Sequence, residues 1–173
     1  MSGAPTRRRP ARVRGGRARS AGRSPGRGAS GRIAKQARAT PDRREETPLV
    51  WLVLPAYNEA ANLPPLLNRV GAAWTGVFPF RVLVVDDGSS DDTVAVAEAA
   101  AARMPVEIVR HVRNQGLAGA VRTAIREVCR RAGDDDTVVI MDADNSHPPE
   151  LVPLMLARIF AGSDMVIASR FVR

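Results

Sequence analysis

Cysteine, histidine and lysine are scarce in this sequence of 173 residues, which holds one cysteine, two histidines and one lysine. With Cys129 as its only cysteine, the chain can form no internal disulfide, which fits a reducing cytosol. Cys129 falls in a helix-like stretch, where we expect it to be a small buried apolar residue. His111 and His147 have no histidine or cysteine partner at metal-ligand spacing, so we expect neither to bind a metal.

Long apolar runs are also missing. No stretch of about 18 consecutive apolar residues occurs, so the sequence predicts no membrane-spanning helix. The basic N-terminal residues are not followed by the apolar region of a secretory signal. The motif G-x-x-x-x-G-K-[ST] is absent, and the first strand-to-helix turn reads PAYNEAAN instead of G-x-G-x-x-G. The sequence therefore argues against a P-loop protein and against a dinucleotide-binding Rossmann domain.

Charge is distributed unevenly along the chain. Residues 1–47 contain 14 Lys and Arg against three acidic residues, a net charge of +11, whereas residues 48–173 have a net charge of −3. We call residues 1–47 the basic arm. It is rich in Arg, Gly, Ser, Ala and Pro and poor in large apolar residues, so we expect it to be disordered. It is either a solvated tail or a segment drawn to a polyanion, an anionic membrane in preference to nucleic acid.

Strand-like and helix-like segments alternate from residue 48 onward. Five short apolar segments are predicted to be strands: 48–55, 80–87, 106–112, 137–144 and 164–169. Four stretches between them have helical spacing or composition: 58–74, 89–104, 116–132 and 148–162. Short apolar strands separated by helices indicate an α/β fold, a mostly parallel sheet with helices on both faces.

Polar residues follow each predicted strand. The sequences at these points are PAYNE, DDGSSDD, RNQG, DADNSH and SR. Because the carboxyl ends of parallel strands meet at one edge, where such sheets bind ligands, we expect a functional site there. The acidic run at 134–136 precedes its strand, so we expect it at the opposite edge as a solvated loop.

Asp142 and Asp144 stand two residues apart at the end of a predicted strand, so both side chains leave on the same face. Carboxylates that close repel each other unless positive charge lies beside them. Mg²⁺ or Mn²⁺ prefers oxygen ligands and could be shared with a substrate phosphate; a pair of solvated loop carboxylates is the alternative. A receiver domain also pairs aspartates at a strand end but needs a late lysine, and Lys35 is the only lysine.

Five segments together resemble family 2 glycosyltransferases with the GT-A fold: LPAYNEAANL, VVDDGSSDDT, NQGLAGAVRTAI, MDADNSHPPE and ASRF. Within that family the resemblance is to the dolichol-phosphate mannosyltransferase and polyprenyl-phosphate glycosyltransferase group, and it covers residues 49–173. It implies metal-dependent, inverting transfer of mannose or glucose from a nucleotide-diphosphate sugar, such as GDP-mannose, to a polyprenyl or dolichyl phosphate. A saccharide acceptor and a non-catalytic protein tethered by its basic arm are the alternatives.

The resemblance also assigns roles to residues at the strand ends. Those matched to the donor nucleotide are Pro55, Tyr57, Glu59, Val85, Asp86 and Asp87. In the segment Asp142, Ala143 and Asp144, Asp144 is the main metal ligand and Asp142 faces the sugar nucleotide. Ser146 stands where many relatives have a glutamine ligand, so either Ser146 or a water is expected to complete the metal's shell. Arg170 matches an arginine that meets the diphosphate or the donor sugar.

The start of the third predicted helix has little side-chain bulk at Asn114, Gln115, Gly116 and Gly119. This favours either close approach to the donor or tight packing of the helix on the sheet. We expect residues 48–173 to be the nucleotide-binding half of a GT-A domain, truncated at its C-terminus. By the same resemblance, the protein is expected to be cytoplasmic and peripheral at the cytoplasmic face of a membrane.

Overall fold

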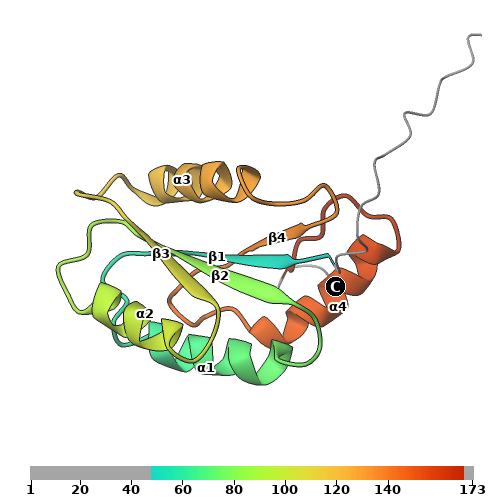
Figure 1. Cartoon of the computed structure of the whole chain (residues 1–173), viewed down its shortest axis with the longest axis horizontal. Helices are drawn as coiled ribbons and strands as arrows, with labels where there is room; N and C mark the ends of the chain where they lie inside the picture. The colour runs from blue at the N-terminus through green and yellow to red at the C-terminus, as the bar shows by residue number, and fades with distance from the viewer. Residues whose placement is uncertain (1–47, 170–173) are drawn as a thin grey trace, which may run out of the picture. The chain divides into compact units, whose positions relative to one another are not determined.

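The computed structural model describes residues 48–169. Its strands in this range are β1 (Val50–Ala56), β2 (Phe80–Asp86), β3 (Val106–Arg110) and β4 (Thr137–Ile140). Its helices are α1 (Leu63–Trp74), α2 (Thr93–Ala101), α3 (Leu117–Cys129) and α4 (Val152–Phe160), with the short 3-10 helix η1 (Pro149–Leu151) before α4. Strands and helices alternate, so the predicted α/β class is confirmed (Figure 1). The basic arm and Arg170 lie outside the described residues.

The four strands form one parallel sheet in the order β3-β2-β1-β4. Val50 of β1 lies opposite Phe80 of β2 on one side and Thr137 of β4 on the other. All carboxyl ends therefore meet at one edge. Figure 1 shows α3 over one face of the sheet and α1, α2 and α4 on the other.

The core lies on both faces of the sheet because alternate residues of a strand point to opposite sides. Leu52, Leu54, Val82 and Val84 pack with the apolar side of α1, including Trp74. The intervening residues of β1 and β2 pack with α3 instead: Trp51, Val53, Leu83, Val85, Ala120, Ala124 and Val128. Burying each large apolar side chain stabilises the fold by about 1.5–3 kcal/mol.

One buried contact fixes the C-terminal end of α1, and prolines begin the helix. The Trp74 indole N–H donates a hydrogen bond to the Pro149 carbonyl at 2.9 Å, which joins α1 to η1. Prolines occupy the first turn of α1, where their missing N–H groups would have no helical acceptor.

No helix within residues 48–169 is both long and apolar enough to cross a membrane.

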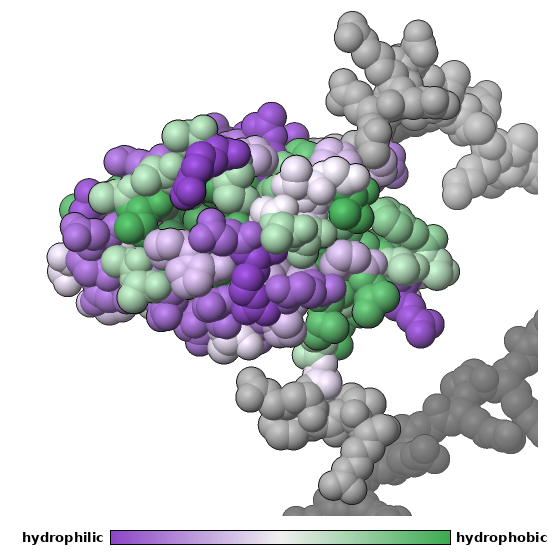
Figure 2. Space-filling view, turned by 90° about the horizontal axis from the view of Figure 1, so that it is seen from below, coloured by the Kyte–Doolittle hydropathy of each residue, from purple (hydrophilic) through white to green (hydrophobic). Residues whose placement is uncertain are grey.

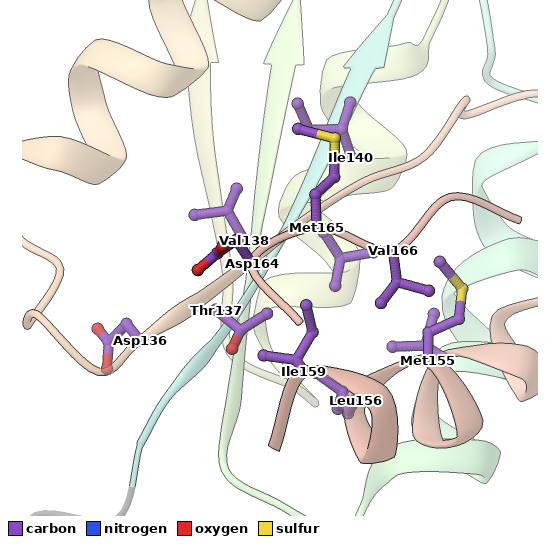
Figure 3. A pocket seen from close by; sticks show the side chains of 12 residues that line it. Asp136, Thr137, Val138, Ile140, Met155, Leu156, Ile159, Asp164, Met165 and Val166 are labelled. Atoms are coloured by element: carbon purple, nitrogen blue, oxygen red, sulfur yellow. The ribbon is translucent and has the colours of Figure 1, made fainter. Parts of the chain in front are cut away.

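The predicted fifth strand at 164–169 is wrong, because this segment forms no strand with β4. The segment, β4 and α4 together line a cavity of about 360 Å³, and Figure 3 shows side chains from all three around it. Met165 and Ile167 remain 76% exposed. An apolar composition suits a strand, but the strand pairings of the described sheet do not include this segment.

Helices lie on both faces of the sheet (Figure 1), as predicted, but β4 is only partly covered. Helix α3 contacts β1 and β2, and the side chains of Val138 and Ile140 on β4 are exposed. Further exposed apolar residues belong to α4 and the segment after it, including Leu154 and Phe160. In Figure 2, apolar surface is visible at the right-hand end of the molecule.

Two smaller predictions are corrected. Cys129 is exposed, because Ala120, Ala124 and Val128 form the buried side of α3 and Cys129 points about 100° away from Val128. Asp136 is partly buried instead of lying in a solvated loop. It accepts hydrogen bonds from the Leu49 and Gly133 amides, both at 2.9 Å, and from the Trp51 indole at 3.1 Å.

Candidate functional site

A cavity of about 280 Å³ opens at the carboxyl edge of the sheet, and we call it the edge cavity. Its lining comes from the end of β1, from the segments that follow β1, β2, β3 and β4, and from the start of α3: Pro55, Ala56, Tyr57, Glu59, Asp87, Asn114, Gly116, Leu117, Ala120, Asp142, Ala143 and Asp144. Nine of the fifteen candidate site residues named from the sequence are in this set. The larger cavity beside β4 is mostly apolar and lies apart from these residues, so the edge cavity is the candidate site.

The edge cavity is strongly acidic. Four of its lining residues are carboxylates, Glu59, Asp87, Asp142 and Asp144, and none of the described lining residues is basic. A phosphate-bearing ligand entering this cavity would be repelled unless a cation accompanied it. The exposed ring of Tyr57 adds an aromatic surface at the same place.

Asp142 and Asp144 share a face, as their spacing predicted. The buried side chains of Met141 and Ala143 point into the core, and the two exposed aspartates alternate with them beyond the end of β4. The Ser146 amide donates to Asp144 Oδ1 at 2.9 Å. Hydrogen bonds from the Ser146 side chain and backbone lower the pKa of Asp144, which favours the ionised form. Ser146 itself is not among the lining residues of the edge cavity.

His147 lies beside the other aspartate of the pair. The Asp142 amide donates to His147 Nδ1 at 3.4 Å, and the same nitrogen is 3.8 Å from Asp142 Oδ2. The imidazole therefore contacts Asp142 through both its backbone and its carboxylate.

Arg69 of α1 holds the loop that follows Asp144. Its Nη1 donates to Asn145 Oδ1 at 2.8 Å, and its Nε and Nη2 donate to the two Glu150 oxygens. Asn145 has a positive φ of 60°, a conformation that asparagine tolerates better than most residues. The hydrogen bond to Asn145 thus anchors the loop at its strained residue.

The neighbouring residues Asp86 and Asp87 occupy different environments. Asp86 is completely buried on the same face as Val82 and Val84; its Oδ1 accepts from the Ser89 amide at 3.2 Å. Within the described residues Asp86 Oδ2 has no hydrogen-bond partner, and Arg110 Nε lies 3.5 Å from it. Asp87, in contrast, lines the edge cavity. Of the segment 85–87 only Asp87 reaches the cavity, because Val85 packs under α3.

His111 contacts Asp87, a relationship that the sequence did not indicate. Its Nδ1 lies 2.6 Å from Asp87 Oδ1, and its Nε2 lies 2.9 Å from Thr123 Oγ1. The Gln115 amide donates to the same Asp87 oxygen at 2.8 Å. Thr123 stands three residues after the buried Ala120, a spacing that places both on one side of α3, but this spacing does not point to His111.

The first two loops of the edge are hydrogen-bonded to each other. The Asn58 amide donates to Ser89 Oγ at 2.9 Å, and the Ser90 amide donates to Asn58 Oδ1 at 2.9 Å. The Glu59 amide donates to Thr93 Oγ1 at 2.8 Å. Asn58 has a positive φ of 56°, a conformation that asparagine tolerates better than most residues. Its backbone amide and its side-chain oxygen each make one of the hydrogen bonds between the loops.

Glycines shape the second and third loops. A Cβ on Gly88 would lie 2.8 Å from the Arg113 carbonyl carbon and from the Asn114 amide nitrogen, so only glycine allows this approach. Gly116 has a φ of 77°, and a Cβ there would meet nothing within 4 Å, so its backbone conformation selects glycine. A Cβ on Gly119 would be 2.6 Å from Gln115 Cβ, which is a packing constraint.

Among the described residues, Asp142 and Asp144 are the candidate carboxylate ligands for a metal. Across residues 48–169 no group of three or more His, Cys, Asp or Glu side chains could hold a metal ion. Asp142 and Asp144 fit an ion such as Mg²⁺ or Mn²⁺, which binds one or two carboxylates, keeps several waters and shares substrate phosphates. The residues present are therefore suited to a divalent ion that arrives with its substrate.

Residues 51–173 match the family model described as Glycosyl transferase family 2, and the chain belongs to this family. It is 37% identical over 124 residues to a dolichol-phosphate mannosyltransferase of Pyrococcus furiosus, covering 72% of this chain and 34% of that protein. It is 38% identical over 123 residues to a polyprenol monophosphomannose synthase of Mycolicibacterium smegmatis, covering 70% of this chain and 44% of that protein. The chain thus spans less than half the length of these two relatives.

Solved structures share the fold, which is of the GT-A type. Glucosyl-3-phosphoglycerate synthase from Mycobacterium tuberculosis, in complex with Mn²⁺, UDP-glucose and phosphoglyceric acid, matches with a TM-score of 0.51 at 28% identity. The match covers 66% of this chain and 40% of that one. S. aureus TarS matches with a TM-score of 0.53 at 24% identity over 65% of this chain and 32% of that one. The latter likeness concerns the fold alone.

Proposed function

We propose that this protein transfers a hexose, mannose or glucose, from a nucleoside-diphosphate sugar to a polyprenyl or dolichyl phosphate. The observation that carries the proposal is the acidic edge cavity, in which Asp142 and Asp144 present paired carboxylates where the parallel strands end. The names of the two relatives, which specify dolichol phosphate and polyprenol, support a lipid phosphate acceptor.

The edge cavity would bind the donor together with Mg²⁺ or Mn²⁺ held by Asp142 and Asp144. When bound, the ion would neutralise the diphosphate and stabilise the charge that builds on it as it leaves. Tyr57 would lie against the base, and Asp87 would accept a hydrogen bond from it. We further propose that Arg170 meets the diphosphate, as the family pattern implies.

The chemical step would be a single displacement. An oxygen of the acceptor phosphate attacks the anomeric carbon while the bond from that carbon to the diphosphate oxygen breaks. The nucleoside diphosphate leaves and the anomeric configuration inverts. The acceptor phosphate is already ionised near neutral pH, so the carboxylates of the cavity need not act as a general base.

Calorimetry tests donor binding. GDP-mannose and UDP-glucose are titrated into the protein with Mn²⁺ and with EDTA, and we expect one of them to bind only with the metal. Asp144→Asn should abolish this metal dependence, whereas Asp164→Asn, on an exposed residue outside the edge cavity, should preserve it. Equal binding in EDTA would contradict the proposal.

The acceptor is tested separately. Radiolabelled sugar is followed from the bound donor into lipid extracted with organic solvent, with polyprenyl phosphate or a saccharide as acceptor. Transfer to the lipid supports the proposed acceptor. Transfer to the saccharide alone would assign the protein to another branch of the family.

A further inference from the structure

Three buried or partly buried side chains from different elements are hydrogen-bonded in a row that ends at Asp87, in the lining of the edge cavity. Thr123 lies on α3, His111 follows β3, and Asp87 follows β2. His111 is only 7% exposed and Asp87 only 3%. Both ring nitrogens of His111 are engaged, Nε2 by Thr123 Oγ1 at 2.9 Å and Nδ1 by Asp87 Oδ1 at 2.6 Å.

The chemistry of these groups sets the direction of the hydrogen bonds. A carboxylate can only accept, so His111 Nδ1 carries the proton and donates to Asp87. In the neutral ring, Nε2 then accepts from the Thr123 hydroxyl. Asp87 thereby fixes the tautomer of His111, Thr123 helps to hold the orientation of the ring, and His111 in turn holds Asp87.

One oxygen of Asp87 is fully used by the protein. Oδ1 accepts from His111 and from the Gln115 amide at 2.8 Å, while no donor to Oδ2 is found within residues 48–169. The carboxylate is held by one oxygen, and because Asp87 lines the edge cavity its other oxygen is the one left for a ligand there. An acceptor fixed in this way selects ligands that bring an N–H group to it.

We propose that His111, held by Thr123, is a positioning residue that aims Asp87 Oδ2 at an N–H group of the donor's base. The inference rests on the proposed function, since it requires a nucleotide in the edge cavity. Uracil and guanine carry a ring N–H on their pairing edge, whereas adenine has an acceptor nitrogen at the corresponding place. The Thr123–His111–Asp87 row would therefore favour uridine or guanosine diphosphates over adenosine diphosphate.

Backbone contacts fix the loops around Asp87, so the position of its carboxylate is set by side-chain and amide hydrogen bonds. Gly88 packs directly against residues 113 and 114, and the His111 amide donates to the Asp86 carbonyl at 2.8 Å. The loops on both sides of Asp87 are thus fixed. When His111 is replaced, Asp87 Oδ1 keeps only the hydrogen bond from the Gln115 amide, so the carboxylate can turn about that contact.

The test compares four variants by calorimetry with saturating Mn²⁺: His111→Leu, His111→Asn, Thr123→Val and the control Thr75→Val, on an exposed threonine at the end of α1. The probes are GDP, UDP, ADP and inorganic pyrophosphate. We expect His111→Leu to weaken the preferred nucleotide by roughly 10- to 100-fold, as when a hydrogen bond to a charged group is lost. Its affinity for pyrophosphate and for ADP should stay close to that of the wild type.

The other variants separate positioning from simple packing. The side-chain amide of His111→Asn can replace Nδ1–H, so this variant should retain most of the nucleotide preference. Thr123→Val should lose part of the preference, and Thr75→Val none. If His111→Leu does not fold in a thermal melt, His111→Asn and Thr123→Val decide the question.

Each outcome is decisive. An unchanged preference for the nucleotide over ADP in His111→Leu and Thr123→Val would overturn the role of His111 while leaving the proposed function intact. An equal loss of pyrophosphate binding would also overturn it, because a general distortion of the cavity would then explain the effect. If the wild-type protein binds none of the nucleotides with Mn²⁺, the proposed function fails and the inference fails with it.

Discussion

Arg69 and Glu150, 81 residues apart in the sequence, form a two-pronged ion pair with hydrogen bonds of 2.9 Å and 2.7 Å. The pair joins α1 to the start of η1, and a third hydrogen bond from Arg69 reaches Asn145, directly after Asp144. The pair raises the pKa of Arg69 and lowers that of Glu150. Both groups face solvent, so the consequence of the pair is local.

We expect Arg69→Met to weaken metal-dependent donor binding several-fold with little change in melting temperature, because exposed ion pairs contribute little to global stability. The loop at 145–150 should exchange its amide hydrogens faster. Arg81→Met, which removes another exposed arginine paired with Glu107, is the control. A large fall in melting temperature without a change in binding would contradict this prediction.

Gly88→Ala should be far more damaging than Gly76→Ala. Both glycines have positive φ, 74° and 78°, so both variants incur the strain of that conformation, about 1–2 kcal/mol. Only the Cβ at position 88 would meet backbone, at 2.8 Å, which adds an overpacking cost of roughly 1–3 kcal/mol. Urea unfolding of the two variants measures the difference, and equal destabilisation would show that the loops can separate.

Asp136 should make the free energy of unfolding depend on pH in the acidic range. Burial alone would raise its pKa, but hydrogen bonds from Leu49, Gly133 and Trp51 outweigh burial, so the pKa in the folded protein is lowered. Its stabilisation is therefore complete above the unfolded value of about 3.9 and is lost as pH falls through the folded value.

Asp136→Asn should lower the free energy of unfolding by about 1–3 kcal/mol at pH 7, because hydrogen bonds to a charged group become neutral. The deficit should shrink in urea melts made at successively lower pH below about 4. Asp164→Asn serves as the control. A deficit that stays constant with pH would assign the effect to packing.

The basic arm should bring the protein to anionic membranes, in keeping with the proposed peripheral location. Each Arg near such a surface contributes on the order of 1 kcal/mol. The whole chain should sediment with phosphatidylserine vesicles at about 0.15 M salt, and a chain lacking residues 1–47 should not, while nucleotide binding persists. Stronger binding to DNA than to vesicles would favour nucleic acid as the partner.

Local patterns were sufficient to predict β1 to β4 and the common face of Asp142 and Asp144. Alternation of buried and exposed residues, as in Met141 to Asp144, is a property of neighbours in sequence. The same reasoning failed at 164–169, where the apolar residues suit a strand but the segment does not pair with the sheet.

Contacts between distant residues could not be predicted in this way. Asp136 accepts a hydrogen bond from the Leu49 amide, 87 residues away in the sequence. His111 is hydrogen-bonded to Asp87, and the two residues follow the neighbouring strands β3 and β2. The residues next to His111 in the sequence do not show whether its side chain is buried between two hydrogen-bond partners or exposed on a loop. Such pairs depend on strand order and register, which the sequence pattern leaves open.

The hydrogen bonds between Asn58 and Ser90 and the close contact at Gly88 have a consequence for ligand binding. Three successive loops of the edge cavity support one another before any ligand arrives. The conformational entropy of ordering them is lost during folding, so little of it remains to oppose association. An insertion in any one of these loops would disturb its neighbours, so variation in ligand preference within this framework should occur through side-chain replacement at fixed loop length.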